Sequence, residues 1–233
     1  MTDILTRDQW IKYEEEFFNE RLGIRRFYST LDTLQTANVV LIGVNPGGDT
    51  FEDHKYAEDE GTAYTSSEQW SSKLQERVTD LFDILGIDLE NDVLATNFYP
   101  VRSKGFNNLK KKSNLNPDKT FNDFEKLCID DMKNILETGE PKKLIITFGS
   151  PSRISLNKLL VNKAIYGSLL EEDTHQFYAN SNHPFKMYHT KYENVDVISL
   201  PHLSCYGVKD SKKERTKDRT TYLQGLMKNI DLE

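Results

Sequence analysis

The chain has 233 residues, of which 37% are hydrophobic and 11% aromatic, enough for one real core. Its net charge of −7 excludes a broadly basic coat for nucleic acid, although a local basic face can still contact phosphates. No apolar run approaches the roughly 20 residues that span a bilayer, and residues 1–13 lack the pattern of a signal peptide. The two cysteines, Cys128 and Cys205, can form neither a disulfide framework nor a cysteine-only metal site. We therefore expect a cytoplasmic protein with no membrane contact.

Helical and strand-like segments alternate along the chain. Helical patterns occur over 8–35, 66–86 (with Ser66 or Ser67 as its N-cap), 121–137, 152–161 and 212–230. Continuous apolar runs, typical of strands buried on both faces, occur over 38–43, 92–99, 143–148 and 195–200. This alternation implies right-handed βαβ units, so we expect a single α/β domain over 1–233, built as three α/β/α layers around a mainly parallel sheet. The polar stretches are expected to be loops: 49–65, 102–118 and 170–190.

Four polar segments follow the predicted strands, at the edge where ligands bind in parallel sheets: 45–49, 97–103, 149–152 and 202–207. Taken alone, each has an ordinary interpretation. Asn45-Pro46-Gly47-Gly48 is a turn that lacks the Walker and dinucleotide patterns, and a lone histidine such as His202 is usually structural. Asn97 is harder to dismiss, because a buried amide without a partner is destabilising by about 1–3 kcal/mol.

Taken in order, these segments resemble the uracil-DNA glycosylase superfamily. Residues 43–47, Gly-Val-Asn-Pro-Gly, are similar to its first motif in the Gly-x-Asn-Pro-Gly form, and Thr96-Asn97 is similar to the strand end that carries the base-reading asparagine. The strand from Leu144 to Gly149 resembles the apolar strand that ends in Phe/Leu-Gly. Residues 201–204, Pro-His-Leu-Ser, resemble the second motif, His-Pro-Ser. The resemblance spans roughly residues 38–210 and implies removal of uracil or a related damaged base from DNA.

The resemblance also implies a role for each matching residue. Asn45 would position the attacking water, although as an amide it is no strong general base. Asn97 would read the O4 and N3–H edge of the base, because an amide both donates and accepts. His202 would donate a hydrogen bond to the charge that develops on O2. Tyr64, in Gly61-Thr62-Ala63-Tyr64, would stack on the flipped base. The implied base-binding set is Gly43, Val44, Tyr64 and Asn97, and the implied catalytic set is Asn45 and His202.

Contacts to DNA are expected on both sides of this site. Tyr206 lies where the family inserts a wedge into the duplex. Basic residues follow both the Asn97 strand and the His202 motif, where they could contact phosphates or simply be solvated. The expected DNA-contacting residues are Ser150, Ser204, Tyr206, Arg102, Lys104 and Lys209. The expected partner is DNA, single- or double-stranded, bound by a monomer that needs no cofactor and no metal.

The sequence departs from the family in three respects. His202 is followed by Leu203 instead of proline, residues 49–60 are rich in acidic residues, and two cysteines cannot hold the iron–sulfur cluster of the four-cysteine branches. The first two differences keep open an alternative, a non-catalytic protein that binds a modified base or nucleic acid. A third interpretation is an unrelated hydrolase with Ser204 or Cys205 as nucleophile, for which we find no Gly-x-Ser-x-Gly elbow.

Overall fold

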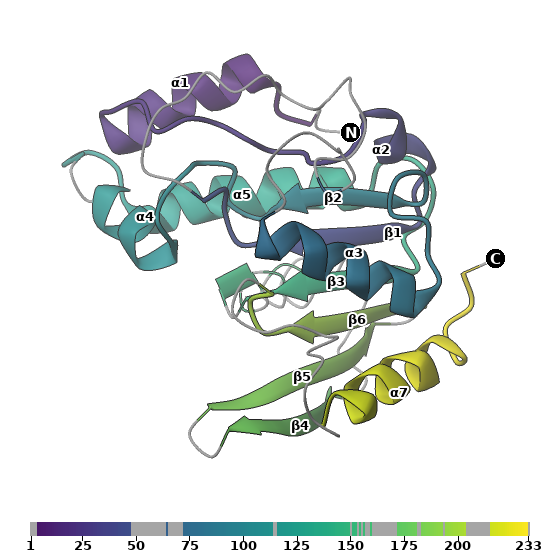
Figure 1. The fold of residues 1–233 in the computed structure, drawn as a ribbon. Coiled ribbons are helices and arrows are strands. Elements are labelled where there is room, and N and C mark those ends of the chain that lie inside the picture. Colours follow the sequence, from purple (N-terminus) through teal and green to yellow (C-terminus); the bar gives the residue numbers. More distant parts are fainter. Residues whose placement is uncertain are drawn as a thin grey trace.

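The computed structural model describes residues 4–47, 64, 72–113, 116–149, 151, 152, 154, 156, 159, 172–180, 183–192, 194–203 and 215–232. Six strands in this part of the chain form one sheet with the order β2-β1-β3-β6-β5-β4 (Figure 1). The strands are β1 (Val39–Gly43), β2 (Val93–Asn97), β3 (Leu144–Phe148), β4 (Glu172–Asn180), β5 (His183–Tyr192) and β6 (Val195–Leu200). β2, β1, β3 and β6 run parallel, whereas β5 and β4 are antiparallel additions. The predicted α/β class with a mainly parallel sheet is confirmed.

The described helices begin and end where local chemistry dictates. They are α1 (Arg7–Phe18), α2 (Asp32–Thr36), α3 (Lys73–Leu85), α4 (Phe106–Ser113), α5 (Phe121–Leu136) and α7 (Arg215–Met227). Thr6, Ser72 and Thr120 each form a capping box with the residue three positions later, which satisfies backbone N–H groups at the start of α1, α3 and α5. α3 ends at Gly86, whose φ of 71° is the left-handed conformation that favours glycine.

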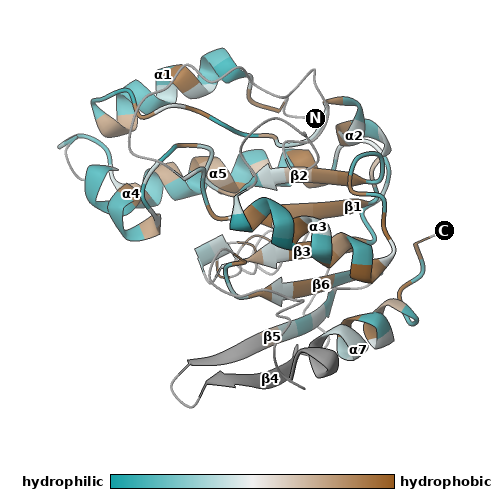
Figure 2. Cartoon of the chain, viewed as in Figure 1, coloured by the Kyte–Doolittle hydropathy of each residue, from teal (hydrophilic) through white to brown (hydrophobic). Residues whose placement is uncertain are grey.

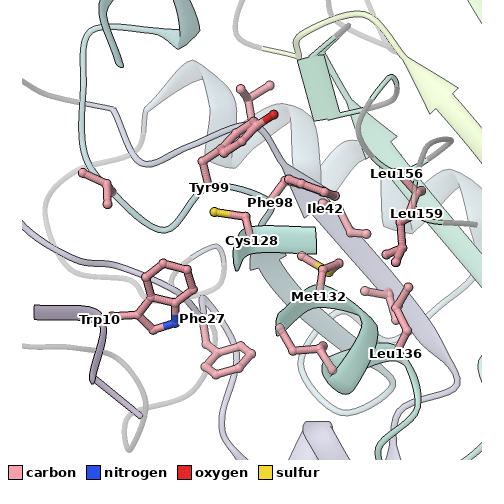
Figure 3. Packing of buried hydrophobic residues seen from close by; sticks show 14 of the residues in the cluster. Trp10, Phe27, Ile42, Phe98, Tyr99, Cys128, Met132, Leu136, Leu156 and Leu159 are labelled. Atoms are coloured by element: carbon pink, nitrogen blue, oxygen red, sulfur yellow. The ribbon is translucent and has the colours of Figure 1, made fainter. Parts of the chain in front are cut away.

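Helices cover both faces of the parallel strands. On one face, buried residues of α5 form a cluster with strand residues such as Ile42 and with Leu156 and Leu159 (Figure 3), and aromatic residues of α1 contact Phe124 of α5. On the other face, α3 and α7 pack on the intervening residues, such as Val39 and Leu41. The parallel strands are accordingly mostly apolar, with polar residues toward their carboxyl ends, while the outward sides of the helices are hydrophilic (Figure 2). This arrangement gives the α/β/α layers. None of the helices that the structure describes is long and apolar enough to cross a membrane.

The prediction of one helix over 8–35 is wrong. α1 stops at Phe18, because Asn19 takes a left-handed conformation, and Gly23 follows with a φ of 98°. The chain then runs extended along β2, with Ile24 bridged to Val101 and Phe27 to Thr96. The buried residues of this segment therefore cover an edge strand rather than forming a helical stripe.

Two of the predicted loops also contain regular structure. Residues 170–190 include most of the β4–β5 hairpin, and 102–118 includes α4. The N-cap of α3 is Ser72, which makes a capping box with Gln75; Ser66 and Ser67 lie outside the described residues.

Candidate functional site

The strand order reverses direction at the carboxyl ends of β1 and β3. From β1 the chain passes to β2 on one side, and from β2 it crosses to β3 on the other side of β1. Loops that leave in opposite directions create a ligand-binding crevice in doubly wound sheets. β1 ends at Gly43 and β3 ends at Phe148.

Gly43 allows two side chains to meet above its Cα. It pairs with Asn97 of β2, and a Cβ placed at position 43 would lie 2.7 Å from Asn97 Oδ1 and 2.9 Å from Phe148 Cζ. Both distances are shorter than van der Waals contact, so even an alanine would displace a neighbour. Glycine is thus required here by close approach, and it brings the amide of Asn97 and the ring of Phe148 to one place.

The amide of Asn97 has a defined orientation. Its Nδ2 donates to the carbonyl oxygen of Arg25 at 3.3 Å, and its backbone N–H donates to the carbonyl oxygen of Arg26 at 3.1 Å. Rotating the amide by half a turn would place Oδ1 against the Arg25 carbonyl, where two acceptors repel. Oδ1 is therefore held toward the space above Gly43, and Nδ2 has a second N–H to offer.

His202 lies beside the same space. Its ring makes an edge-to-face contact with Phe148, with centroids 5.4 Å apart. Gly149, with a φ of 97°, has no room for a side chain, because a Cβ would lie 2.5 Å from Val44 Cγ2 and 3.6 Å from His202 Cδ2. Burial lowers the pKa of His202 below its ordinary value of 6.5, so the imidazole is neutral at pH 7 and keeps one N–H donor.

The backbone next to His202 is fixed by Leu203. Leu203 is fully buried in the core on the α3 side of the sheet. Its carbonyl oxygen accepts a hydrogen bond of 2.7 Å from a guanidinium nitrogen of Arg77, on α3. A buried side chain and a charge-assisted hydrogen bond therefore hold the backbone that carries His202.

Asn45 is held by the loop that follows β2. Its Nδ2 donates to the carbonyl oxygen of Pro46 at 2.9 Å, and to the carbonyl and hydroxyl oxygens of Ser103 at 3.2 and 3.1 Å. Ser103 is buried, and its own backbone N–H donates to Pro46 O at 3.1 Å. These contacts fix the amide plane and leave Oδ1 of Asn45 as a hydrogen-bond acceptor, which is what the positioning of a water molecule requires.

Tyr64 lies in the core beside this site. It is buried and stacks on Tyr28, with centroids 5.4 Å apart and ring planes inclined by 21°. The guanidinium group of Arg25 lies over the Tyr28 ring, 4.3 Å from its centroid. Burial raises the pKa of Tyr64, which keeps its phenol neutral. Because Tyr28 covers one face of Tyr64, a base could stack only on its other face or by displacing Tyr28.

The basic residues after β2 have mixed surroundings. The backbone N–H of Arg102 donates to Gly23 O, and Lys112 forms an ion pair of 2.8 Å with Glu20. Lys104 is exposed and lines a hollow of about 400 Å³ with residues 105–108 and Pro151. The remaining expected DNA contacts lie outside the described residues: Ser150, Ser204, Tyr206 and Lys209. Cys205 also lies outside them.

Sequence reasoning missed several residues that shape the site: Arg25, Tyr28, Arg77, Ser103 and Phe148. Phe148 could have been found, because it ends a predicted strand at the same edge as Gly43. The other four carry no local signal, since their contacts with the site join segments far apart in the chain, up to 126 residues for Arg77 and Leu203.

The sequence matches no protein-family model, and no curated protein is similar to it. Among the residues that the structure describes, no three His, Cys, Asp or Glu side chains are grouped to hold a metal ion. Functional interpretation therefore depends on the motifs and on the geometry of the site.

Proposed function

We propose that the chain is a DNA glycosylase that hydrolyses the N-glycosidic bond of uracil, or of a related damaged base, in single- or double-stranded DNA. One observation carries the proposal. Gly43 brings Asn97 Oδ1 and the Phe148 ring together, and Phe148 in turn contacts His202. An oriented amide, an aromatic ring and a neutral imidazole are the groups that a flipped pyrimidine needs for recognition, packing and charge stabilisation.

The orientation of Asn97 favours uracil over cytosine. Oδ1 accepts from the N3–H of uracil, and the free N–H of Nδ2 donates to O4. Cytosine presents the opposite pattern, with an amino donor and an unprotonated N3, so it needs a rotated amide. The hydrogen bond to Arg25 opposes that rotation.

Bond cleavage follows from the remaining groups. As the glycosidic bond lengthens, the sugar becomes oxocarbenium-like and negative charge collects on the departing base. His202 stabilises this charge with a hydrogen bond to O2, an effect worth about 10²–10³ in rate for a single donor. Asn45 Oδ1 orients the water that attacks the sugar, and the proton that this water loses passes to the departing uracil anion or to bulk solvent. An amide cannot take the proton of this water, so the reaction depends on leaving-group stabilisation and proceeds slowly.

Single-turnover excision tests the proposal directly. Uracil-containing oligonucleotide, as single strand and as duplex, is incubated with excess protein, and abasic sites are cleaved with alkali. We expect cleaved product from the wild-type protein, and a rate lower by at least about 10² for His202→Ala and for Asn97→Ala. Asn229→Ala, an exposed amide remote from the sheet edge, serves as the control with unchanged rate. No product from the wild-type protein at any excess would reject the activity.

One observation favours a second candidate, a protein that binds a modified base without cleaving it. Position 45 carries an amide, whose oxygen is only a weak base, so it supplies no strong base for the attacking water. Calorimetry with uracil, hypoxanthine and abasic DNA separates the two candidates. Binding without product supports the second, and the absence of binding removes it.

A further inference from the structure

β4 and β5 form a ribbon that extends past the rest of the sheet. Tyr188 of β5 pairs with Ser199 of β6, and β6 ends one residue later at Leu200. Residues 183–186 of β5 therefore lie beyond the end of β6, where their partners belong to β4. At about 3.3 Å per residue, this overhang is about 13 Å long. The ribbon reaches past the carboxyl ends of the parallel strands (Figure 1).

The overhang lies next to the candidate site. β5 is the hydrogen-bonded neighbour of β6, and β6 leads directly into Pro201 and His202. Neighbouring strands are about 4.8 Å apart, so the ribbon begins beside the segment that carries His202. Arg102 and α4 follow β2, at the opposite end of the row of parallel strands. The ribbon and these residues thus flank the site.

The ribbon has an unusual charge composition for this chain. The chain contains 37 acidic residues among 233, and β4 begins with two of them, Glu172 and Asp173, but the rest of the ribbon, from Thr174 to Tyr192, contains none. Its basic and aromatic residues are His175, Phe177, Tyr178, His183, Phe185, Lys186, Tyr188, His189, Lys191 and Tyr192. His189 and Lys191 are already paired with Asp196 of β6, at 2.7 and 3.3 Å. The remaining residue types contact phosphates and stack on bases. A segment without acidic residues is what a chain of net charge −7 needs in order to approach a polyanion.

We propose that the β4–β5 ribbon is a DNA-binding arm that contacts the strand next to the flipped nucleotide. Two-stranded ribbons fit the major groove, and aromatic residues bind single strands by stacking. With one phosphate per 3.4 Å of each strand, a 13 Å overhang spans about four nucleotides. The arm supplies affinity on the His202 side of the site and takes no part in bond cleavage. The proposal rests on the proposed function, because that function fixes where the flipped nucleotide lies. Its test measures DNA binding separately from excision.

The register allows the arm to be shortened without disturbing the sheet. Gln176 and Lys186 are cross-strand partners, so residues 177–185 can be replaced by a two-residue Asn-Gly turn that retains the Tyr188–Ser199 pairing. Fluorescence anisotropy then measures the affinity of the whole protein for a labelled, uracil-free single strand and its duplex. We expect the shortened protein to bind at least about tenfold more weakly, while its excision rate at saturating protein stays unchanged.

Lys186→Glu provides a second variant in case the shortened protein does not fold. It is expected to weaken binding and to reduce the dependence of affinity on salt by about one phosphate contact. Lys228→Glu is the matched control, because this exposed lysine lies at the amino ends of the parallel strands, away from the site. It follows α7 and precedes Leu232, whose carbonyl oxygen accepts a hydrogen bond from Asn38, the residue before β1.

The possible outcomes separate the arm from the activity. Unchanged DNA affinity in both folded ribbon variants overturns the arm, whether or not uracil is excised. Ribbon-dependent DNA binding without excision supports the arm and rejects only the proposed function. A change from dimer to monomer on shortening, with DNA affinity unaltered, would assign the ribbon to contact between copies of the chain and would also overturn the proposal.

Discussion

Substitution of Gly43 by alanine tests the geometry of the site with a single methyl group. The new Cβ would lie 2.7 Å from Asn97 Oδ1 and 2.9 Å from Phe148 Cζ, so one or both side chains must move. Overpacking of this kind destabilises proteins by about 1–3 kcal/mol. If Asn97 moves, its hydrogen bond to Arg25 is also lost, and this adds about 1 kcal/mol. The protein should remain folded, because a domain has a stability of about 5–15 kcal/mol.

The matched control for this substitution is Gly47→Ala, four residues further along the same loop. A Cβ at Gly47 meets no atom within 4 Å, so this variant should have wild-type stability and activity. Chemical denaturation measures the free energy of unfolding, and single-turnover excision measures the effect on the site. We expect Gly43→Ala to lose stability and at least about tenfold in rate, since 1.4 kcal/mol corresponds to a factor of ten. Equal behaviour of the two variants would show that Asn97 and Phe148 do not meet above Gly43.

Three further predictions concern groups that support the site or the core. Arg77→Met should slow single-turnover excision about tenfold or more while changing the melting temperature little, and a rate equal to wild type would show that its hydrogen bond to Leu203 does not position His202. Asp131→Ala should lower the free energy of unfolding by about 3–5 kcal/mol. In the wild-type protein the Asp131 carboxylate lies 2.6 Å from the Arg26 guanidinium, and its removal leaves that guanidinium charged, buried and unpaired with Asp131. A loss below about 1 kcal/mol in urea denaturation would contradict this prediction. Burial lowers the pKa of Lys142 from 10.5 to about 8, so the charged form of this side chain opposes folding at pH 7. The stability of the wild-type protein should therefore rise as the pH increases from about 8 toward 10.5, the pKa of Lys142 in the unfolded chain. Lys142→Met should abolish that rise and increase the free energy of unfolding at pH 7 by about 1–3 kcal/mol. The same pH dependence in this variant as in the wild-type protein would show that Lys142 does not cause the rise.

The parallel part of the fold could be predicted because its strands are buried on both faces. β1, β2, β3 and β6 are continuous apolar runs, and their order with the intervening helices implies parallel crossovers. The β4–β5 ribbon carries no such run. Its residues mix polar, aromatic and basic types, and its strands are defined by pairing with each other. The predicted helix over 8–35 fails at residues 20–30 for a related reason, since the burial of these residues comes from contact with the edge of β2 and not from a helical stripe.

For the site, the sequence could predict which residues share an edge but not how they are held. Gly43, Asn97 and His202 follow strand ends, so topology alone brings them together. The orientation of Asn97 depends on the Arg25 carbonyl, which no motif encodes. Likewise, the sequence shows that Leu203 follows His202, but only the structure shows that its side chain is buried and that its carbonyl accepts from Arg77.

A crystal structure of the protein with uracil and abasic DNA tests the central claim most directly. We expect uracil at the carboxyl ends of β1 and β3, with N3–H donating to Asn97 Oδ1, O4 accepting from Asn97 Nδ2, and O2 accepting from the ring N–H of His202. Asn97 Nδ2 should keep its bond to the Arg25 carbonyl in this complex. Uracil bound elsewhere, or bound here with the Asn97 amide reversed, would contradict the account.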